Sequence, residues 1–147
     1  MKPAAEIKIA IVSGAFWEEI VTNLEKHCLT TLEKKGINKE NIKIVRVPGS
    51  FEIPLMVKTM AKQKKYDAII TFGAIHKGKT YHFELIANEC ARACMSLGLE
   101  HQVPVIFEVL AVYNIEDAYD RSTQTKDNRG VEAANAAYKM IEAMSGV

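Results

Sequence analysis

The residues best suited to chemistry lie in one short polar segment, residues 73–82, between a predicted strand and a predicted helix. In such a connection the first N–H groups of the helix lack helical partners. These donors and the positive end of the helix dipole favour an anion such as phosphate. Thr80 adds a hydroxyl group, and Gly78 lets a ligand approach the backbone closely. Lys77 and Lys79 raise the local positive potential. The segment therefore predicts a phosphate-binding loop.

His82 ends this segment and brings an imidazole, which carries protons readily near neutral pH. An imidazole beside a bound anion predicts acid–base chemistry on a phosphorylated substrate. The alternative is a solvated basic loop in which Thr80 caps the helix and His82 has no chemical role. Spacing alone leaves both interpretations open.

A second segment, residues 48–54, also joins a predicted strand to a predicted helix. Gly49 and the start of the helix offer backbone donors, and Glu52 could accept hydrogen bonds from a polyol. Alternatively, Ser50 and Glu52 only cap the helix and complement its dipole. We expect Ser50 to occupy the N-cap position of this helix.

Two aromatic residues, Phe16 and Trp17, directly follow the first predicted strand. A flat heterocycle could stack on such a ring. The alternative is that these rings fill the interface between helix and sheet. Phe107 lies inside the fourth predicted strand, a position typical of a core residue.

A third polar segment, near residues 121–130, carries the cations Arg121, Lys126 and Arg129. Arginine is suited to bidentate contacts with phosphate, so the three side chains could form a mobile anion clamp. Ordinary surface charges on a solvated connection between two helices are the alternative.

Hydrophobic periodicity predicts the elements that position these segments. Apolar runs indicate strands at residues 7–13, 42–47, 67–72 and 103–110. Apolar spacing of three and four indicates helices at residues 18–36, 51–61, 82–97, 115–121 and 131–144. Strands that alternate with helices form a parallel sheet covered on both faces. We therefore expect a single α/β domain over residues 1–147, a three-layer α/β/α sandwich with a four-stranded parallel sheet and flavodoxin-like topology. Ligands of such sheets bind outside the carboxyl ends of the strands.

Composition excludes several classes of function. The 147 residues carry 19 Lys and Arg against 18 Asp and Glu, a formal net charge of +1, whereas nucleic-acid binders usually have a basic excess. No apolar run approaches the roughly 18 residues that span a bilayer, and the N-terminus lacks the apolar stretch of a secretory signal. The cysteines, Cys28, Cys90 and Cys94, have no metal-binding spacing and are expected to be reduced core thiols. We expect a cytoplasmic protein that binds no nucleic acid, membrane or metal.

At these same loops the sequence resembles the lumazine synthase family. Several motifs in order are more specific than any single loop, and the similarity extends over roughly residues 7–141. The matching motifs are VPGSFEIP at residues 47–54, G-x-I-x-K-G-x-T-x-H-F-E at 73–84, VPVIF at 103–107, NIE-x-A at 114–118, DR at 120–121 and NRG-x-EAA at 128–134.

The resemblance implies a transferase that makes 6,7-dimethyl-8-ribityllumazine in the penultimate step of riboflavin biosynthesis. Its substrates are 5-amino-6-(D-ribitylamino)uracil and (S)-3,4-dihydroxybutan-2-one 4-phosphate, and phosphate and water are released. The family needs no metal or redox cofactor, so none is expected. The fold that the resemblance implies agrees with the one that periodicity predicts.

The resemblance also implies roles for individual residues. Phe16 stacks on the pyrimidine, His82 transfers protons, and Phe107 and Arg121 act from a neighbouring subunit. The remaining substrate-binding positions are Ser50, Phe51 and Glu52 for the ribityl chain, Ala74, Ile75 and His76 along the pyrimidine, and Lys79 and Thr80, with Arg121, for the phosphate.

Several positions depart from the usual pattern of the family, among them residues 111–113, Lys126 and Asp127, and three single substitutions stand out. Trp17 stands at a usual small polar residue, His76 at a usual aliphatic residue and Glu108 at a usual glycine. Two other functions therefore stay open at this point. One is the archaeal-type riboflavin synthase, which dismutates the lumazine and has a similar fold. The other is a shell protein that binds a lumazine or flavin without catalysis.

The resemblance further implies a homo-oligomer with active sites between subunits. Pentamers, pairs of pentamers and icosahedral capsids all occur in the family. The segment from Arg121 to Gly130 has no insertion relative to the capsid-forming pattern, which permits a capsid. The arm before Ile7 is short, however, and such arms help to hold neighbouring subunits together. Riboflavin synthase, which consumes the lumazine, is a candidate partner.

Overall fold

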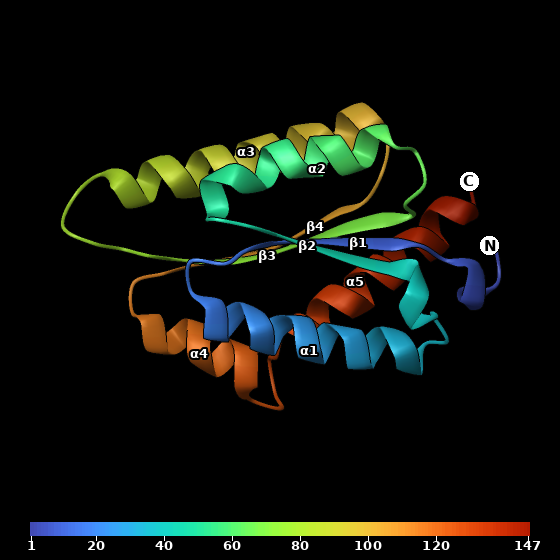
Figure 1. The fold of residues 1–147 in the computed structure, drawn as a ribbon, viewed down its shortest axis with the longest axis horizontal. Coiled ribbons are helices and arrows are strands. Elements are labelled where there is room, and N and C mark those ends of the chain that lie inside the picture. Colours follow the sequence, from blue (N-terminus) through green and yellow to red (C-terminus); the bar gives the residue numbers. More distant parts are fainter.

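Four parallel strands form one sheet in the order β2-β1-β3-β4 (Figure 1). The computed structural model describes residues 1–147. The strands are β1 (Ile9–Gly14), β2 (Ile42–Val47), β3 (Ala68–His76) and β4 (Val105–Val112). Every residue of β1 is buried, because helices cover both faces of the sheet.

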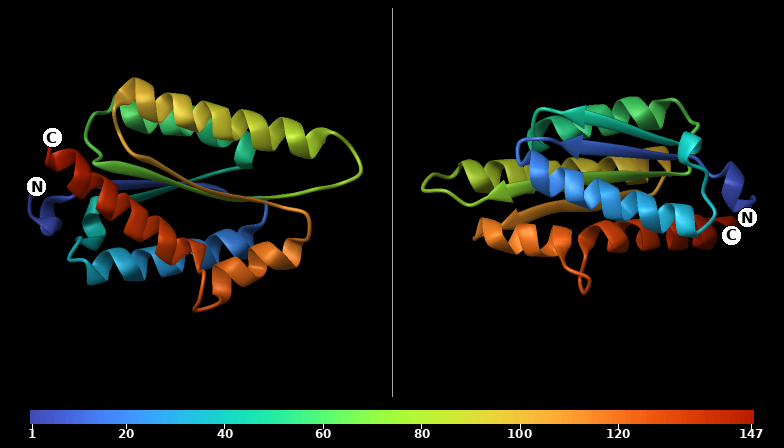
Figure 2. Two further views of the ribbon diagram at one scale, coloured as in Figure 1. Left: turned by 180° about the vertical axis from the view of Figure 1, so that it is seen from behind. Right: turned by 60° about the horizontal axis from the view of Figure 1, so that its bottom comes forward.

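Five helices form the outer layers of a three-layer α/β/α sandwich, which confirms the predicted fold class. They are α1 (Glu18–Lys34), α2 (Ile53–Lys62), α3 (His82–His101), α4 (Ile115–Thr123) and α5 (Arg129–Ser145). Helices α2 and α3 cover one face of the sheet, and α1, α4 and α5 cover the other (Figures 1 and 2). Short 3-10 turns lie at Ala4–Glu6, Lys39–Asn41 and Ser50–Glu52. No helix combines the length and the apolar character needed to cross a bilayer.

The core is divided by the sheet into two clusters. Successive side chains of a strand point to opposite faces. Ile9, Ile11 and Phe72 therefore pack toward α1 and α5, whereas Ala10 and Val12 pack toward α2 and α3. The cysteines belong to these clusters: all three are buried and unpaired.

Strand β3 is longer than the sequence predicts. Residues 73–76 were expected in a loop, but they continue β3 and pair with β4 as far as His76 and Val112. Helix α3 is also longer, because it continues through Gly98 to His101 and ends at Gln102, whose φ is 50°. A Cβ atom at Gly98 would lie 3.3 Å from the Val103 carbonyl oxygen, so glycine here lets α3 pack closely against the chain that enters β4 and does not end the helix.

Two helix starts also differ from the prediction. Ser50 is not the N-cap of α2: it begins a 3-10 turn, its side chain makes no capping hydrogen bond, and α2 begins at Ile53. Helix α5 begins at Arg129, two residues earlier than apolar spacing indicates. Its N-cap is Asn128, whose side-chain oxygen accepts hydrogen bonds from two N–H groups of the first turn at 3.0 and 3.1 Å.

Candidate active site

A cavity of about 790 Å³ opens at the carboxyl ends of β1 and β3. Strand β2 lies on one side of β1, and β3 and β4 lie on the other, so the strand order reverses between β1 and β3. Parallel sheets of this kind bind their ligands at such a reversal point. The cavity brings together most of the predicted substrate-binding residues. Its lining includes Phe16, Trp17, Ser50, Phe51, Glu52, Ala74, Ile75, His76 and His82.

One wall of the cavity is the free edge of β3. Pairing between β1 and β3 ends at Ser13 and Phe72, whereas pairing between β3 and β4 continues to His76. The stretch from Ala74 to His76 therefore has no partner strand on the β1 side. Unpaired backbone N–H and C=O groups can form hydrogen bonds with the edge of a planar heterocycle.

Aromatic side chains form a second wall. The Phe16 and Trp17 rings meet edge to face, with centroids 5.7 Å apart, and the Trp17 and His76 rings do the same at 6.4 Å. Phe16 is 76% exposed, so it is not a plug between helix and sheet. Trp17 is half-buried and packs against the core. An exposed ring held by a buried neighbour is suited to stacking on a flat ligand.

The floor of the cavity is set by the segment that follows β2. A Cβ atom added to Gly73 would lie 2.7 Å from the Ser50 Oγ, so only glycine lets the buried Ser50 hydroxyl pack against β3. The Ser50 carbonyl accepts a hydrogen bond from the Cys90 thiol of α3 at 3.2 Å. These contacts fix the segment, while Phe51 and Glu52 beside Ser50 stay exposed.

The predicted phosphate loop lies beyond the cavity and projects past the end of the sheet (Figure 1). Gly78, Lys79 and Thr80 are exposed. The N-cap position of α3 is Tyr81, without a side-chain capping bond, and the Thr80 Oγ1 lies 3.5 Å from the His82 nitrogen, at the limit of a hydrogen bond. The first N–H groups of α3 are thus open to an anion, and His82 lies both in the first turn and on the cavity wall.

Comparison with known proteins agrees with this geometry. The family model described as 6,7-dimethyl-8-ribityllumazine synthase matches residues 6–145. A protein of Ruthia magnifica subsp. Calyptogena magnifica named 6,7-dimethyl-8-ribityllumazine synthase is 39% identical over 148 residues, which cover 97% of this chain and 89% of the relative. The chain belongs to the 6,7-dimethyl-8-ribityllumazine synthase family. It is therefore a transferase of riboflavin biosynthesis.

Like Lys79 and Thr80 of the phosphate loop, two further residues for which the lumazine synthase family implies a role lie outside this cavity. Phe107 and Arg121 border a separate groove along β4 and α4, together with Tyr113. Phe107 is 38% exposed, so it is not a core residue. The Arg121 guanidinium donates to the Asp117 carbonyl at 3.1 Å and is otherwise exposed. One chain by itself thus does not bring these two side chains to the cavity.

Arg129, one of the three cations of the predicted anion clamp, is paired within the chain. Its guanidinium donates two hydrogen bonds to the Glu108 carboxylate, both 2.9 Å long. Glu108, which replaces the usual glycine of lumazine synthases, is 7% exposed and needs this counter-charge. Lys126 is exposed in the connection between α4 and α5. Arg121 is also exposed, and its guanidinium makes only a long, exposed contact of 3.8 Å with a carboxylate, that of Asp117 on its own helix, a contact of little strength.

The pairing of Glu108 with Arg129 predicts a pH-dependent loss of stability. Burial raises the pKa of the Glu108 carboxyl above its ordinary value of 4.5, although Arg129 opposes the rise. When the pKa of a carboxyl is higher in the folded than in the unfolded state, the free energy of unfolding falls as pH rises between the two pKa values. Arg129→Met removes the charge that opposes the rise, so the folded-state pKa of Glu108 rises further and the pH range of this fall widens. We expect a loss of about 2 kcal/mol at pH 8 and little loss near pH 4.5 in urea unfolding.

A matched double variant controls for packing at this site. In Glu108→Gln combined with Arg129→Met the buried charge is absent, so the pH dependence that Arg129→Met introduces should vanish. An equal loss for Arg129→Met at both pH values would show that the guanidinium contributes by packing and not by charge.

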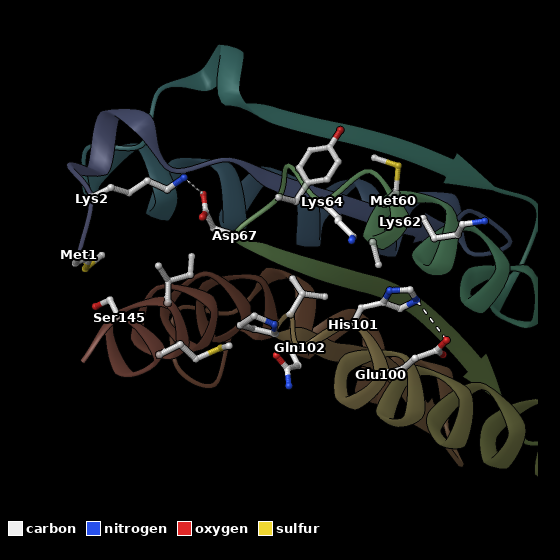
Figure 3. A pocket seen from close by; sticks show the side chains of 16 residues that line it. Met1, Lys2, Met60, Lys62, Lys64, Asp67, Glu100, His101, Gln102 and Ser145 are labelled. Carbon is white, nitrogen blue, oxygen red and sulfur yellow. Dashed lines mark ion pairs between the residues drawn. The ribbon is translucent and has the colours of Figure 1, made fainter. Parts of the chain in front are cut away.

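The largest cavity, about 920 Å³, lies at the opposite end of the sheet and contains none of the predicted site residues (Figure 3). Its charged groups are partly paired with one another: Lys2 with Asp67 at 2.9 Å and His101 with Glu100 at 3.9 Å. Most of the predicted site residues instead line the smaller cavity.

Sequence analysis did not identify three residues that line this smaller cavity: Leu85, Ile86 and Glu89. They lie on α3 at spacings of three, four and seven from His82, which places them on one face of the helix. That spacing was the available signal. It was missed because the apolar pattern of α3 also fits its buried face.

Proposed function

We propose that this chain condenses 5-amino-6-(D-ribitylamino)uracil with (S)-3,4-dihydroxybutan-2-one 4-phosphate, forming 6,7-dimethyl-8-ribityllumazine and releasing phosphate and water. One observation carries the proposal. A single cavity holds an exposed aromatic ring, a free strand edge and the His82 imidazole at the start of a helix whose first N–H groups are open to an anion. A planar heterocycle fits the half formed by the aromatic ring and the strand edge, and a phosphorylated ketone fits the half formed by His82 and the open N–H groups.

The reaction uses groups that this site provides. The substrate amine attacks the ketone carbonyl, and loss of water leaves an imine. Removal of the proton on the carbon next to the imine then lets phosphate depart with the electrons of its C–O bond and leaves an enol. The enol becomes a ketone by proton transfer, and attack of the second amine on this ketone with loss of a second water closes the ring. Both substrates are reactive, so holding amine and ketone together supplies much of the rate acceleration. Proton transfer by His82 and stabilisation of the departing phosphate supply the rest.

The residue roles proposed here follow the two halves of the site. Phe16 stacks on the pyrimidine, with Trp17 and His76 behind it. Ser50, Phe51 and Glu52 hold the ribityl chain. Lys79 and Thr80 bind the phosphate, together with the open N–H groups of α3 and the positive end of its dipole.

An oligomer completes the proposed site. Phe107 and Arg121 lie on the same groove of the surface, away from the cavity of their own chain. In a ring of subunits, a surface of one subunit meets a different surface of its neighbour, so the groove of one chain can face the cavity of the next. We propose that the ring is a pentamer, alone or within a larger assembly, and that it acts in the cytoplasm, where riboflavin synthase consumes its product.

Turnover of purified substrates tests the proposed function. The protein is incubated with the pyrimidine and the ketone phosphate, or with the lumazine alone, and the products are followed by absorbance. We expect lumazine and inorganic phosphate from the first mixture and no change in the second. Riboflavin from lumazine alone would instead indicate a riboflavin synthase. Binding of lumazine without turnover of either mixture would indicate a non-catalytic shell protein.

Phe16→Ala tests the stacking half of the site. Loss of an aromatic stacking partner should raise the KM for the pyrimidine about tenfold, equivalent to about 1.4 kcal/mol. The KM for the ketone phosphate should change little. Phe16→Tyr keeps the ring and serves as the matched control. If Trp17→Ala has the larger effect on the pyrimidine KM, Trp17 is the stacking ring instead.

A further inference from the structure

The side chain of Lys77, a residue of the predicted phosphate loop, already has partners within the chain. Its ammonium group lies 2.8 Å from the Glu84 Oε1. It also lies 5.8 Å from the centroid of the Phe83 ring and 5.6 Å from that of Tyr113, within the range of cation–π contacts. The two rings are 6.1 Å apart. One carboxylate and two aromatic rings therefore surround this ammonium.

These contacts connect the two ends of the phosphate loop. At one end, the Lys77 N–H donates to the Val112 carbonyl at 3.0 Å and so attaches the residue to the sheet. At the other end, Glu84 lies in the first turn of α3, two residues after His82. The mutual hydrogen bond is the main cause of a raised Lys77 pKa and a lowered Glu84 pKa, so both groups stay charged near neutral pH.

We propose that Lys77 is a positioning residue: with Glu84, Phe83 and Tyr113 it holds the phosphate loop in its binding conformation beside His82. This inference rests on the proposed function. Preorganisation lowers the entropy lost when a loop closes on its ligand. Lys79, which makes no ion pair, is then the ammonium of this loop that stays available to the phosphate.

Removing Glu84 separates the two possible roles of Lys77. If Lys77 binds phosphate directly, Glu84→Ala frees its ammonium and leaves or improves affinity for the ketone phosphate. If Lys77 positions the loop, Glu84→Ala acts like Lys77→Met. We expect each variant to raise the KM for the ketone phosphate about tenfold and to leave the KM for the pyrimidine within about twofold.

A double variant and a conservative variant complete the test. Lys77→Met combined with Glu84→Ala should raise the KM for the ketone phosphate no more than either single variant does, because both substitutions break the same ion pair. Lys77→Arg keeps the charge and the ring contacts and should stay within about threefold of the wild type. Lys79→Met should raise the same KM but add to the effect of Glu84→Ala. A normal KM in Glu84→Ala beside a raised one in Lys77→Met would overturn the proposal.

Hydrogen–deuterium exchange gives a readout that does not depend on turnover. The amides at the two ends of the loop, those of residue 77 and Leu85, are hydrogen-bonded to the Val112 and Tyr81 carbonyls and should exchange about tenfold faster in Lys77→Met and in Glu84→Ala than in the wild type. Unchanged exchange in both variants would overturn the positioning role. If the wild type turns over neither substrate mixture, the proposed function fails, whereas the exchange result still decides the role of Lys77.

Discussion

His82→Ala is expected to lower kcat for lumazine formation about a hundredfold, because general acid–base catalysis by a placed side chain contributes at least that factor. The imidazole lies in the first turn of α3, on the cavity wall and next to the open N–H groups of the phosphate loop. The KM values should change much less, since the ring makes few contacts needed for binding. Steady-state product absorbance with both purified substrates measures the effect.

His76→Ala is the matched control for this prediction. His76 also lines the cavity, but it contacts Trp17 at the end of β3 and lies on the aromatic wall. Its loss should affect the pyrimidine KM more than kcat, which should stay within about tenfold. A larger fall of kcat in His76→Ala than in His82→Ala would assign proton transfer to the other imidazole.

Arg121→Ala should lower kcat/KM for the ketone phosphate about a hundredfold, because a charge-assisted bidentate contact with phosphate is lost. Arg121 borders a groove separate from the cavity, so we expect its effect to be exerted on a neighbouring subunit. Inactive subunits of two kinds should therefore complement each other. Unfolding His82→Ala and Arg121→Ala proteins together and refolding them as a mixture makes such hybrids.

The mixture has a definite expected yield. In a ring with random order, an intact site needs His82 from one chain and Arg121 from its neighbour. The first chain must therefore be the Arg121→Ala variant, and the neighbour the His82→Ala variant. Equal amounts of both then restore about one quarter of the wild-type activity. Each variant refolded alone is the control. Activity no greater than the sum of the two controls would contradict a site shared between subunits.

The sequence predicted the strands well where β-branched residues form a short run, as in β1, which is wholly buried, and in the partly buried edge strand β2. It missed the end of β3, because Gly73 interrupts the apolar run and residues 73–76 continue the strand through pairing with β4, more than thirty residues away. The same lack of local signal hid the 3-10 turn that begins at Ser50.

The gathering of the candidate site residues was predictable because the carboxyl ends of parallel strands meet at one edge of the sheet. Phe16, Ser50 and His76 come from three separate loops and strand ends, yet they line one cavity. The pairing of Glu108 with Arg129 was not predictable. It joins the interior of β4 to the start of α5, and no local periodicity reports a buried ion pair across two elements.

A crystal structure of the assembled protein with inorganic phosphate tests the central claim most directly. We predict an anion at residues 78–81, bound by Thr80 and backbone N–H groups, with the His82 imidazole within about 3 Å of it or one water away. Arg121 of an adjoining subunit should reach the same anion. An empty loop, or His82 packed away among side chains with Arg121 far from the cavity, would contradict the account.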